Sequence, residues 1–310
     1  MIKTIAKKLS VFVLALSLLL MSAVQFSADS YLVSKDGFYY LIENSEAVIY
    51  GYDYNNRTTD IVVPNTISDY PVTKIAPRAF SNNTKLTSIS FTDAMSLKSI
   101  GKYAFYACSS IEEIIIPGWL NSIGEFAFQD CTALKSVSIY SNVSVIPEQA
   151  FGNCISLEKI NIPSTVKSIG SYAFYNCSAL TELTLSKNIT DIANGAFYNC
   201  PNLTLYGYYD TVAESYAEQN NIPFVHLDKK VISGDVNLDG KIDVNDVTLL
   251  QRYIAGESVL TDDAVKAADF NKDRIIDIID ATAIQTFIAN GHNSVSYTHL
   301  RAHETTLHLV

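Results

Sequence analysis

The chain has 310 residues, of which 48% are hydrophobic and 17% are charged. This composition can fill buried cores, which excludes wholesale disorder, and at about 150 residues per domain the length predicts roughly two folded units. The formal net charge is -10, with 22 Lys and Arg against 32 Asp and Glu. Nucleic-acid binding depends on cationic side chains that displace counterions, so neither DNA nor RNA is an expected partner.

The first 28 residues predict a signal peptide. Lysines at the start of the chain precede an apolar run from Leu9 to Met21. Such a run matches a signal-peptide core and is too short to cross a hydrocarbon layer of about 30 Å. Cleavage is expected near Ala28, with Ala23 as the other candidate, and a retained interfacial anchor is the alternative. No later segment has the length of a transmembrane span, so we expect a secreted, extracellular protein that is associated with a complex or a cell surface.

A period of 23 residues organises the middle of the chain, and all five cysteines fall on it. Each cysteine has a phenylalanine three residues earlier and an alanine four residues earlier. A variant first copy begins at Ile75 and has Asn83 in the cysteine position. The cysteines are Cys108, Cys131, Cys154, Cys177 and Cys200. Because one copy cannot bury its apolar side chains alone, the copies must stack into a solenoid.

Within each copy the pattern predicts one short parallel strand and one turn. In the copy from Leu157 to Ile162, Leu and Ile point inward while Glu158 and Lys159 point outward. Pro163 ends this strand because proline has no amide hydrogen for a ladder. The Ala-Phe pair predicts a short helical or 3₁₀ turn on the opposite edge. We therefore expect a β-solenoid with about six repeats.

The repeat unit reads Ile-Gly-x-x-Ala-Phe-x-x-Cys-x-x-Leu-x-x-Ile-x-Ile-Pro and resembles the leucine-rich repeats of the BspA-like surface proteins of bacteria. The resemblance covers about residues 40–227. It implies an N-terminal hairpin cap from Ala47–Tyr52 through Ile61–Pro64, and a closing helix and strand from Tyr206 to Val225. The expected divisions are an N-terminal cap at 29–74, repeats at 75–205 and a C-terminal cap at 206–228. Caps are needed because an open solenoid end exposes core and strand edges.

The repeat domain is expected to be non-catalytic. Its cysteines sit beside Phe and Leu, where packing is favoured over redox or metal chemistry, since thiols in apolar surroundings are unreactive. The central outward strand position holds mostly small polar side chains, with no aromatic platform for sugar rings and no carboxylate pair spaced for glycosidic chemistry. These positions are Ser90, Ile115, Ser138, Asn161 and Thr184. Tyr103, Phe126 and Tyr172 form either an exposed stripe or contacts between turns.

Residues 231–290 contain 11 Asp and Glu against 5 Lys and Arg, and two loops typical of calcium sites. Each loop places oxygen ligands at positions 1, 3, 5, 7, 9 and 12, a pattern that suits a hard cation with six to eight oxygen ligands. We predict two Ca²⁺ ions. The first loop supplies Asp235, Asn237, Asp239, the carbonyl of Lys241, Asp243 and Asp246; the second supplies Asp269, Asn271, Asp273, the carbonyl of Ile275, Asp277 and Asp280.

The sixth loop position distinguishes the two predicted sites. Gly240 occupies it in the first loop, where the chain turns sharply, and Arg274 occupies it in the second. A left-handed backbone costs a non-glycine residue roughly 1 kcal/mol or more. The second site is therefore expected to be weaker than the first.

Each loop leads into an apolar helix, over Val247–Ile254 and Ala281–Ile288, with a linking helix near Asp262–Ala268. An ordinary EF-hand has a helix before each loop and usually Glu at position 12, whereas this sequence has Asp there and Gly234 before the first loop. Residues 229–290 are instead similar to a type I dockerin, a small all-α module found in cellulosomes.

The dockerin resemblance implies docking onto a cohesin module of a scaffoldin. Matched residue by residue, the recognition positions are Val244, Asn245, Gln251 and Arg252 in the first half and Ile278, Ile279, Gln285 and Thr286 in the second. They differ from the Ser-Thr pair of the best-known dockerin group, so the cohesin type stays open. The near symmetry of the two halves would allow two related docking orientations.

Residues 291–310 break every pattern. A metal site from His299, His303 and His308 is one interpretation, but the stretch resembles translated sequencing-adapter read-through, and we expect a disordered, non-native tail.

The sequence thus predicts a secreted, non-catalytic recognition or adhesion protein, docked by a calcium-dependent dockerin onto a cellulosome-type scaffoldin. Its repeats would bind a protein or a surface glycan. The alternatives are a dockerin-bearing polysaccharide-degrading enzyme, for which the repeat register leaves no catalytic domain, and a cell-wall-displayed adhesin or inhibitor.

Overall fold

A computed structural model describes residues 31–53 and 59–291. The predicted signal peptide and the predicted tail from residue 292 lie outside the described residues. The chain divides into two compact units at the boundary between Asp228 and Lys229. Within the described ranges no helix has both the length and the apolar character needed to cross a membrane.

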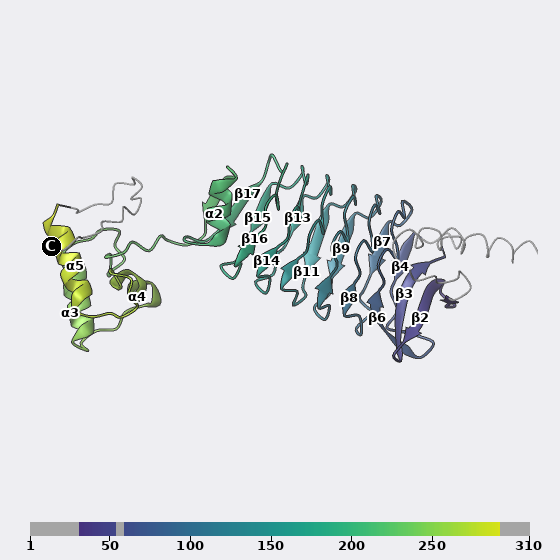
Figure 1. The fold of residues 1–310 in the computed structure, drawn as a ribbon, viewed down its shortest axis with the longest axis horizontal. Helices are drawn as coiled ribbons and strands as arrows, with labels where there is room; N and C mark the ends of the chain where they lie inside the picture. Colours follow the sequence, from purple (N-terminus) through teal and green to yellow (C-terminus); the bar gives the residue numbers. More distant parts are fainter. Residues whose placement is uncertain (1–30, 54–58, 292–310) are drawn as a thin grey trace, which may run out of the picture. The chain divides into compact units, whose positions relative to one another are not determined.

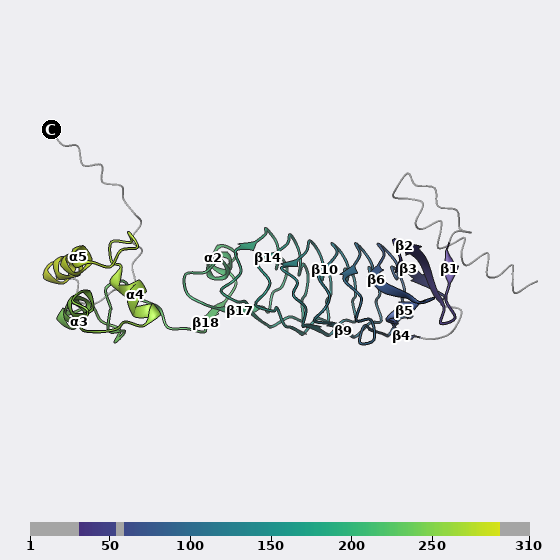
Figure 2. The same cartoon turned by 90° about the horizontal axis from the view of Figure 1, so that it is seen from below.

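The first unit begins with an antiparallel hairpin (Figure 2). β2 (Phe38–Glu43) pairs with β3 (Glu46–Tyr52), and β1 (Leu32–Val33) adds to β2. The turn residues Asn44 and Ser45 have φ of 50° and 64°, the two positive values that a two-residue hairpin turn requires.

The N-terminal cap was therefore predicted with the wrong hairpin partner. Strand β4 (Asp60–Val62) was expected to complete the hairpin, but it pairs in parallel with β7. β2 is the partner because a tight two-residue turn joins it to β3, whereas β4 follows a longer connection and joins the repeats.

The repeats form a solenoid of about eight turns, which confirms the predicted fold class (Figure 1). One line of parallel strands follows the predicted alternation; in β9, for example, Ile114 and Ile116 are buried while Glu113 and Ile115 are exposed. Its members are β4, β7 (Ser88–Ser90), β9 (Glu113–Ile116), β11 (Ser136–Ile139), β13 (Lys159–Ile160), β15 (Glu182–Thr184), β17 (Thr204–Gly207) and β18 (Phe224–His226).

A second line of short parallel strands ends at the repeat isoleucine of each copy and was not predicted. In three copies a glycine follows this isoleucine and allows close approach of adjacent turns: a Cβ on Gly124 would lie 2.4 Å from the backbone nitrogen of Lys102. The strands are β6 (Tyr70–Ile75), β8 (Ser99–Ile100), β10 (Ser122–Ile123), β12 (Val145–Ile146), β14 (Ser168–Ile169) and β16 (Asp191–Ile192), with β5 (Thr66–Ile67) antiparallel to β6.

The solenoid core is built on two ladders of repeated side chains. The repeat phenylalanines from Phe80 to Phe197 stack nearly parallel, with centroid distances between 5.1 and 5.6 Å. All five cysteines are free, and each thiol donates a hydrogen bond to a phenylalanine carbonyl of the preceding copy at 3.0 to 3.2 Å. Burial raises the pKa of Cys108 to about 12 and that of Cys200 to about 11. The cysteines therefore contribute packing and one weak hydrogen bond each.

The Ala-Phe segment is a pair of tight turns, so the expectation of a helical or 3₁₀ turn was wrong. Tyr103 and Ala107 have φ of 57° and 56°, and such left-handed residues interrupt any helix. The amide of Phe105 donates across to Ala127 of the next copy at 2.8 Å, and Tyr103 donates to Glu125 at 3.0 Å. The turn edge is thus held by backbone bonds between copies, as the strands are.

A ladder of polar side chains follows the same turn edge. Asn199 donates through Nδ2 to Oδ1 of Asn176, Asn176 donates to Asn153, and Asn153 donates to Asp130, each at 2.6 Å. These residues precede the cysteines and have φ between 56° and 61°. Asn and Asp suit this position because their short side chains tolerate the left-handed backbone.

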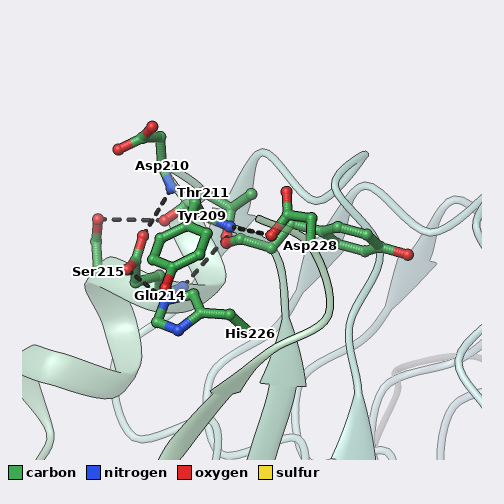
Figure 3. Close-up of polar contacts among 8 residues, drawn as sticks. Tyr209, Asp210, Thr211, Glu214, Ser215, His226 and Asp228 are labelled. Atoms are coloured by element: carbon green, nitrogen blue, oxygen red, sulfur yellow. Dashed lines mark hydrogen bonds and ion pairs between the residues drawn. The ribbon is translucent and has the colours of Figure 1, made fainter. Parts of the chain in front are cut away.

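The far end of the solenoid is closed by α2 (Val212–Gln219) and β18, as predicted (Figure 3). Glu214 accepts hydrogen bonds from the Asp210 amide and pairs with Nε2 of His226, both at 2.7 Å. The ring of Tyr209 stacks on His226 at 3.6 Å, and Tyr216 covers the last ring of the phenylalanine stack, Phe197, at 5.8 Å. The cap therefore covers the apolar end of the core.

The second unit consists of three helices, α3 (Val244–Ile254), α4 (Asp262–Ala268) and α5 (Ile278–Ala289). Its small core centres on side chains from the loops and from all three helices: Val236, Ile242, Val247, Leu250, Ala268, Ala281 and Ile284. Between residues 229 and 235, all of which the structure describes, no helix leads into the first loop, and Gly234 there has φ of 95°. The two loop-helix halves and the linking helix agree with the predicted organisation.

Candidate functional site

The first acidic loop is folded by hydrogen bonds from its own backbone to its carboxylates. Asp235 is 3% exposed and accepts from the amides of Asp239 at 3.0 Å and Gly240 at 2.9 Å. Asp246 is fully buried and accepts from the amides of Asn237 and Asp243, at 2.9 and 2.8 Å. Because Asp246 lies in the first turn of α3, these bonds tie both the start of the loop and the N-cap residue to that helix.

The second loop repeats this arrangement. Asp280 is fully buried and accepts from the amides of Asn271 and Asp277, both at 3.1 Å. Asp269 accepts from the amide of Arg274 through Oδ2 at 3.1 Å. Asp243 and Asp277 also cap the helices that follow, in capping boxes completed by Asp246 and Asp280.

One buried carboxylate oxygen indicates that the loop residues fit a cation. Oδ1 of Asp269 is buried and has no hydrogen-bond partner. Buried polar atoms are nearly always paired, so an unpaired carboxylate oxygen at the first ligand position fits a site for a hard cation. Burial also raises the pKa of the Asp246 carboxyl, an effect that a nearby cation opposes.

The loop carboxylates do not converge fully. Among the described residues, no group of three or more His, Cys, Asp and Glu side chains gathers closely enough to hold a metal by itself. Like charges converge only around a cation, and each loop also offers an Asn side chain and a carbonyl as ligands. Ion binding therefore requires side-chain adjustment within loops whose backbone is already folded.

The sixth loop position has the conformation that the sequence predicted. Gly240 has φ of 89° and Arg274 has φ of 69°. A Cβ added to Gly240 would meet no atom within 4 Å, so the difference between the loops at this position is conformational and involves no steric clash.

All eight predicted docking positions are exposed on α3 and α5, which lie side by side (Figures 1 and 2). Val244, Ile278 and Ile279 are more than half exposed, at 66%, 57% and 58%. Exposed branched apolar side chains at the start of two packed helices form a surface suited to another protein.

The aromatic side chains on the face formed by the Ala-Phe turns, called the turn face, were expected to form either an exposed stripe or contacts between adjacent turns, and the structure shows both. Tyr103 stacks on Phe126 at 4.6 Å, and the guanidinium of Arg78 lies 4.4 Å from the Tyr103 centroid. These rings are contacts between adjacent turns. Tyr172 and Tyr198 are also in edge contact, yet both remain exposed.

The strand face of the solenoid is hollowed, and here the sequence analysis missed two residues. A shallow groove of about 1120 Å³ follows the predicted polar column, and beside it Trp119 and Tyr140 line a second pocket. Neither residue belongs to the strand column, because each follows the end of a strand. The sequence did offer one indication of this pocket, because Trp119 is the single tryptophan of the chain and follows Pro117, where the strand ends.

Comparisons with known proteins agree with both units. A family model described as BspA type leucine rich repeat region matches in six copies, over residues 50–164 and 98–220, and a model described as dockerin type I domain matches residues 233–289. The first match covers more than half of the chain. No curated protein matches the sequence.

Solved structures of bacterial leucine-rich repeat proteins are similar to the repeat unit. A leucine-rich repeat protein of T. pallidum is 24% identical, with a TM-score of 0.48 over 62% of this chain and 97% of that chain. A leucine-rich cell surface protein of Faecalibacterium prausnitzii is 24% identical, with a TM-score of 0.46 over 60% and 56%. A leucine-rich repeat protein of Eubacterium ventriosum is 27% identical, with a TM-score of 0.45 over 56% and 51%. The chain spans about half of the length of the last two proteins.

Proposed function

Because this chain belongs to the BspA-type leucine-rich repeat family and carries a dockerin type I domain, we propose that it is a secreted, non-catalytic recognition protein docked onto a cellulosome-type scaffoldin. A type I dockerin is a calcium-binding module and implies a cohesin partner. The repeat unit is then the part that the dockerin brings to the complex, and it recognises a surface ligand.

The unpaired Oδ1 of Asp269 is the observation that carries the calcium part of this proposal. We assign one Ca²⁺ ion to each loop. The ligands are the six oxygens of each loop named from the sequence, which include the carbonyls of Lys241 and Ile275. Calcium supplies the charge that lets the acidic side chains converge, and the residues supply the oxygen cage and the caps of α3 and α5.

The docking surface in this proposal consists of the exposed recognition positions on α3 and α5. Val244, Ile278 and Ile279 supply apolar contact, while Gln251 and Arg252 supply polar contacts on the first helix. Their equivalent places in the two halves support two related docking orientations. The proposed module boundaries remain 29–74, 75–205, 206–228 and 229–290 for the cap, repeats, closing cap and dockerin.

Calcium-dependent capture of a cohesin tests the proposal. The full chain, without its signal peptide, is applied to a panel of immobilised type I cohesins in calcium and again in EDTA. We expect at least one cohesin to retain the chain in calcium only. The variant Asp269→Ala should weaken retention because it removes a first-position ligand, whereas Asp262→Asn, an exposed carboxyl outside the loops, should bind as the parent does. Equal retention with and without EDTA would contradict the proposal.

A further inference from the structure

A pocket of about 540 Å³ lies on the strand face near the N-terminal end of the solenoid. Its walls come from β7, from β9 with the turn that follows it, and from the residue after β11. Trp119 and Tyr140 supply aromatic rings, and Ile115 of β9 supplies an exposed apolar side chain. The pocket is therefore an aromatic site beside a strand column that holds mostly small polar side chains.

The indole of Trp119 and the backbone of Tyr140 are each held by a hydrogen bond to a neighbouring turn. Nε1 of Trp119 donates a hydrogen bond to the carbonyl of Ala94 at 2.8 Å, which links the indole to the preceding copy. The amide of Tyr140 donates to the carbonyl of Ile116 at 2.9 Å. Trp119 is 38% exposed and Tyr140 is 68% exposed. Two accessible rings on a rigid scaffold lose little conformational entropy when a ligand packs on them.

The rim of the pocket is rich in hydroxyl groups and poor in charge. Oγ of Ser90 and Oγ1 of Thr92 lie 2.9 Å apart; Ser90 Oγ also accepts from the amide of Thr92, and Thr92 Oγ1 donates to Asp93, both at 3.3 Å. Each hydroxyl oxygen keeps a lone pair that can accept from a ligand hydroxyl. Oγ of Ser88 donates to Asp60, outside the pocket. Among the described residues, Glu113 is the single charged residue of the lining. A chain of net charge -10 and a pocket with one carboxylate both disfavour an anionic ligand.

The pocket continues into the polar groove of the strand face, since Glu113 lines both. Beyond Glu113 the groove presents the hydroxyls of Ser136, Ser138 and Thr184, and it is also lined by Tyr208 and by the charged side chains of Glu158, Lys159 and Glu182. A ligand anchored on the aromatic rings therefore has room to extend along the repeats. This continuity favours an elongated ligand over a single small molecule.

We propose that this pocket binds one sugar ring of a neutral glycan chain, with the rest of the chain lying along the groove. The inference rests on the proposed recognition function and names its ligand class. A pyranose presents an apolar C–H face and a rim of hydroxyls. Trp119 and Tyr140 pack against the first, and Ser90, Thr92 and Glu113 hydrogen-bond to the second.

A polypeptide fits this site less well. Peptides that bind to sheets add to an exposed strand edge and use backbone hydrogen bonds. Here β9 pairs with β11, and the carbonyl of Ser90 in β7 accepts from Val63 of the preceding copy, so the pocket lies on a face and not at an edge. Side-chain hydroxyls and rings are what this face offers, and these groups match a sugar.

The single tryptophan provides a direct test. The full chain in calcium is titrated with hexamers of β-glucose, β-xylose and β-mannose while indole fluorescence is recorded, and it is also applied to an array of neutral plant and microbial cell-wall oligosaccharides. We expect at least one glycan to bind and to change Trp119 emission. Tyr140→Ala should weaken that binding about tenfold, because one stacking ring is lost, and Glu113→Gln should weaken it less.

Two controls separate the possible outcomes. Tyr198→Ala removes an exposed ring from the turn face and should leave glycan affinity unchanged, and the thermal midpoint of each variant should match the parent. Absence of binding across the array, or equal loss in Tyr198→Ala and Tyr140→Ala, would overturn the inference. An indole response to a peptide ligand and to no glycan would overturn it too. Cohesin capture tests the docking proposal independently, because it uses residues of the other unit.

Discussion

Left-handed residues recur throughout this chain, and at most positions the residue type suits that conformation. Gly240 has the conformational freedom that the first loop needs, whereas Arg274 adopts φ of 69° with a full side chain. The amide of Arg274 is nevertheless used, since it donates to Asp269. The second loop therefore keeps its hydrogen bonds and carries a local conformational cost.

Replacing Arg274 with glycine is expected to strengthen the second loop. Arg274→Gly removes a left-handed non-glycine residue, so the calcium-loaded unit should gain about 1 kcal/mol in free energy of unfolding. The thermal midpoint of the second unit, measured by calorimetry of the full chain in calcium, should rise accordingly. The matched variant Gly240→Arg should lower that midpoint. An unchanged midpoint in both variants would contradict a conformational cost at position six.

The asparagine ladder makes a second residue-scale prediction. Asn176→Ala removes two side-chain hydrogen bonds and places alanine at φ of 56°, whereas Asn176→Gly removes the same bonds and tolerates the backbone. We expect both variants to lower the stability of the repeat unit in urea, with alanine worse by about 1 kcal/mol. Ala107 occupies the equivalent position in an earlier copy with the same φ, so the fold accepts this cost.

Asn188 provides the control for the ladder variants. It is an exposed asparagine of the same unit, and its side chain donates to the carbonyl of Ser164. Asn188→Ala should change stability by less than either ladder variant, because its partner stays open to water. Equal losses at Asn176 and Asn188 would mean that the ladder adds nothing to an ordinary surface hydrogen bond.

At the scale of elements, one line of strands was predictable, whereas the second line of strands and the turn edge were not. Alternation such as Leu157 to Ile162 reports directly which side chains are buried, so one line of strands followed from the sequence. The Ala-Phe edge has no such signal, because its left-handed residues include Tyr103 and Ala107, which do not favour that conformation intrinsically. Backbone hydrogen bonds between adjacent copies stabilise this edge, and such bonds cannot be inferred from the sequence of one copy.

The same contrast applies to the candidate sites. The acidic loops could be recognised from residue types at fixed spacing, because their ligands are local in sequence. Trp119 and Tyr140 come from two different copies, and only the stacking of those copies brings them to one pocket. The exposed Val244, Ile278 and Ile279 needed the family resemblance, since exposure of an apolar helix residue cannot be read from its pattern alone.

The cysteine ladder makes stability depend on alkaline pH. Burial raises the pKa of these thiols in the folded chain, to about 12 for Cys108, while an unfolded thiol ionises near 8.5. As pH rises above about 8.5, the thiols of the unfolded chain lose their protons before those of the folded chain. The contribution of each thiol to the free energy of unfolding is therefore fully present below that pH and is lost progressively as pH approaches the folded pKa. The slope approaches about 1.4 kcal/mol per pH unit for each thiol.

Cys154→Ala isolates this effect. The variant loses the packing and the bond to Phe128 at every pH, but its stability should fall less steeply than that of the parent between pH 8.5 and 10.5. Urea denaturation of both proteins across this range gives the two slopes. Tyrosine ionisation acts equally on both and cancels in the comparison. Parallel slopes would contradict a buried, protonated thiol at this position.

At the scale of the whole molecule, the two units depend on different sources of stability. The repeat unit has a continuous apolar core, whereas the second unit has a small one supplemented by its acidic loops. Calcium binding should therefore stabilise only the second unit, by about 2.7 kcal/mol for each site at a hundredfold excess of ion over Kd.

Differential scanning calorimetry of the full chain should show this separation. We expect two transitions in calcium, one of which shifts down by more than about 10 °C in EDTA while the other is unchanged. The double variant Asp235→Ala and Asp269→Ala should reproduce the EDTA scan in calcium. A single transition that moves as a whole would instead indicate that the two units unfold together.

The uniform 23-residue spacing of the cysteines has an evolutionary consequence. Recombination between two adjacent copies, in the same register, deletes or duplicates one complete coil. The flanking coils then meet through the same strand pairs, phenylalanine contacts and turn-edge bonds that they already use. The length of the solenoid can thus change by one whole coil in a single genetic event, while the N-terminal hairpin, the C-terminal cap and the second unit stay intact.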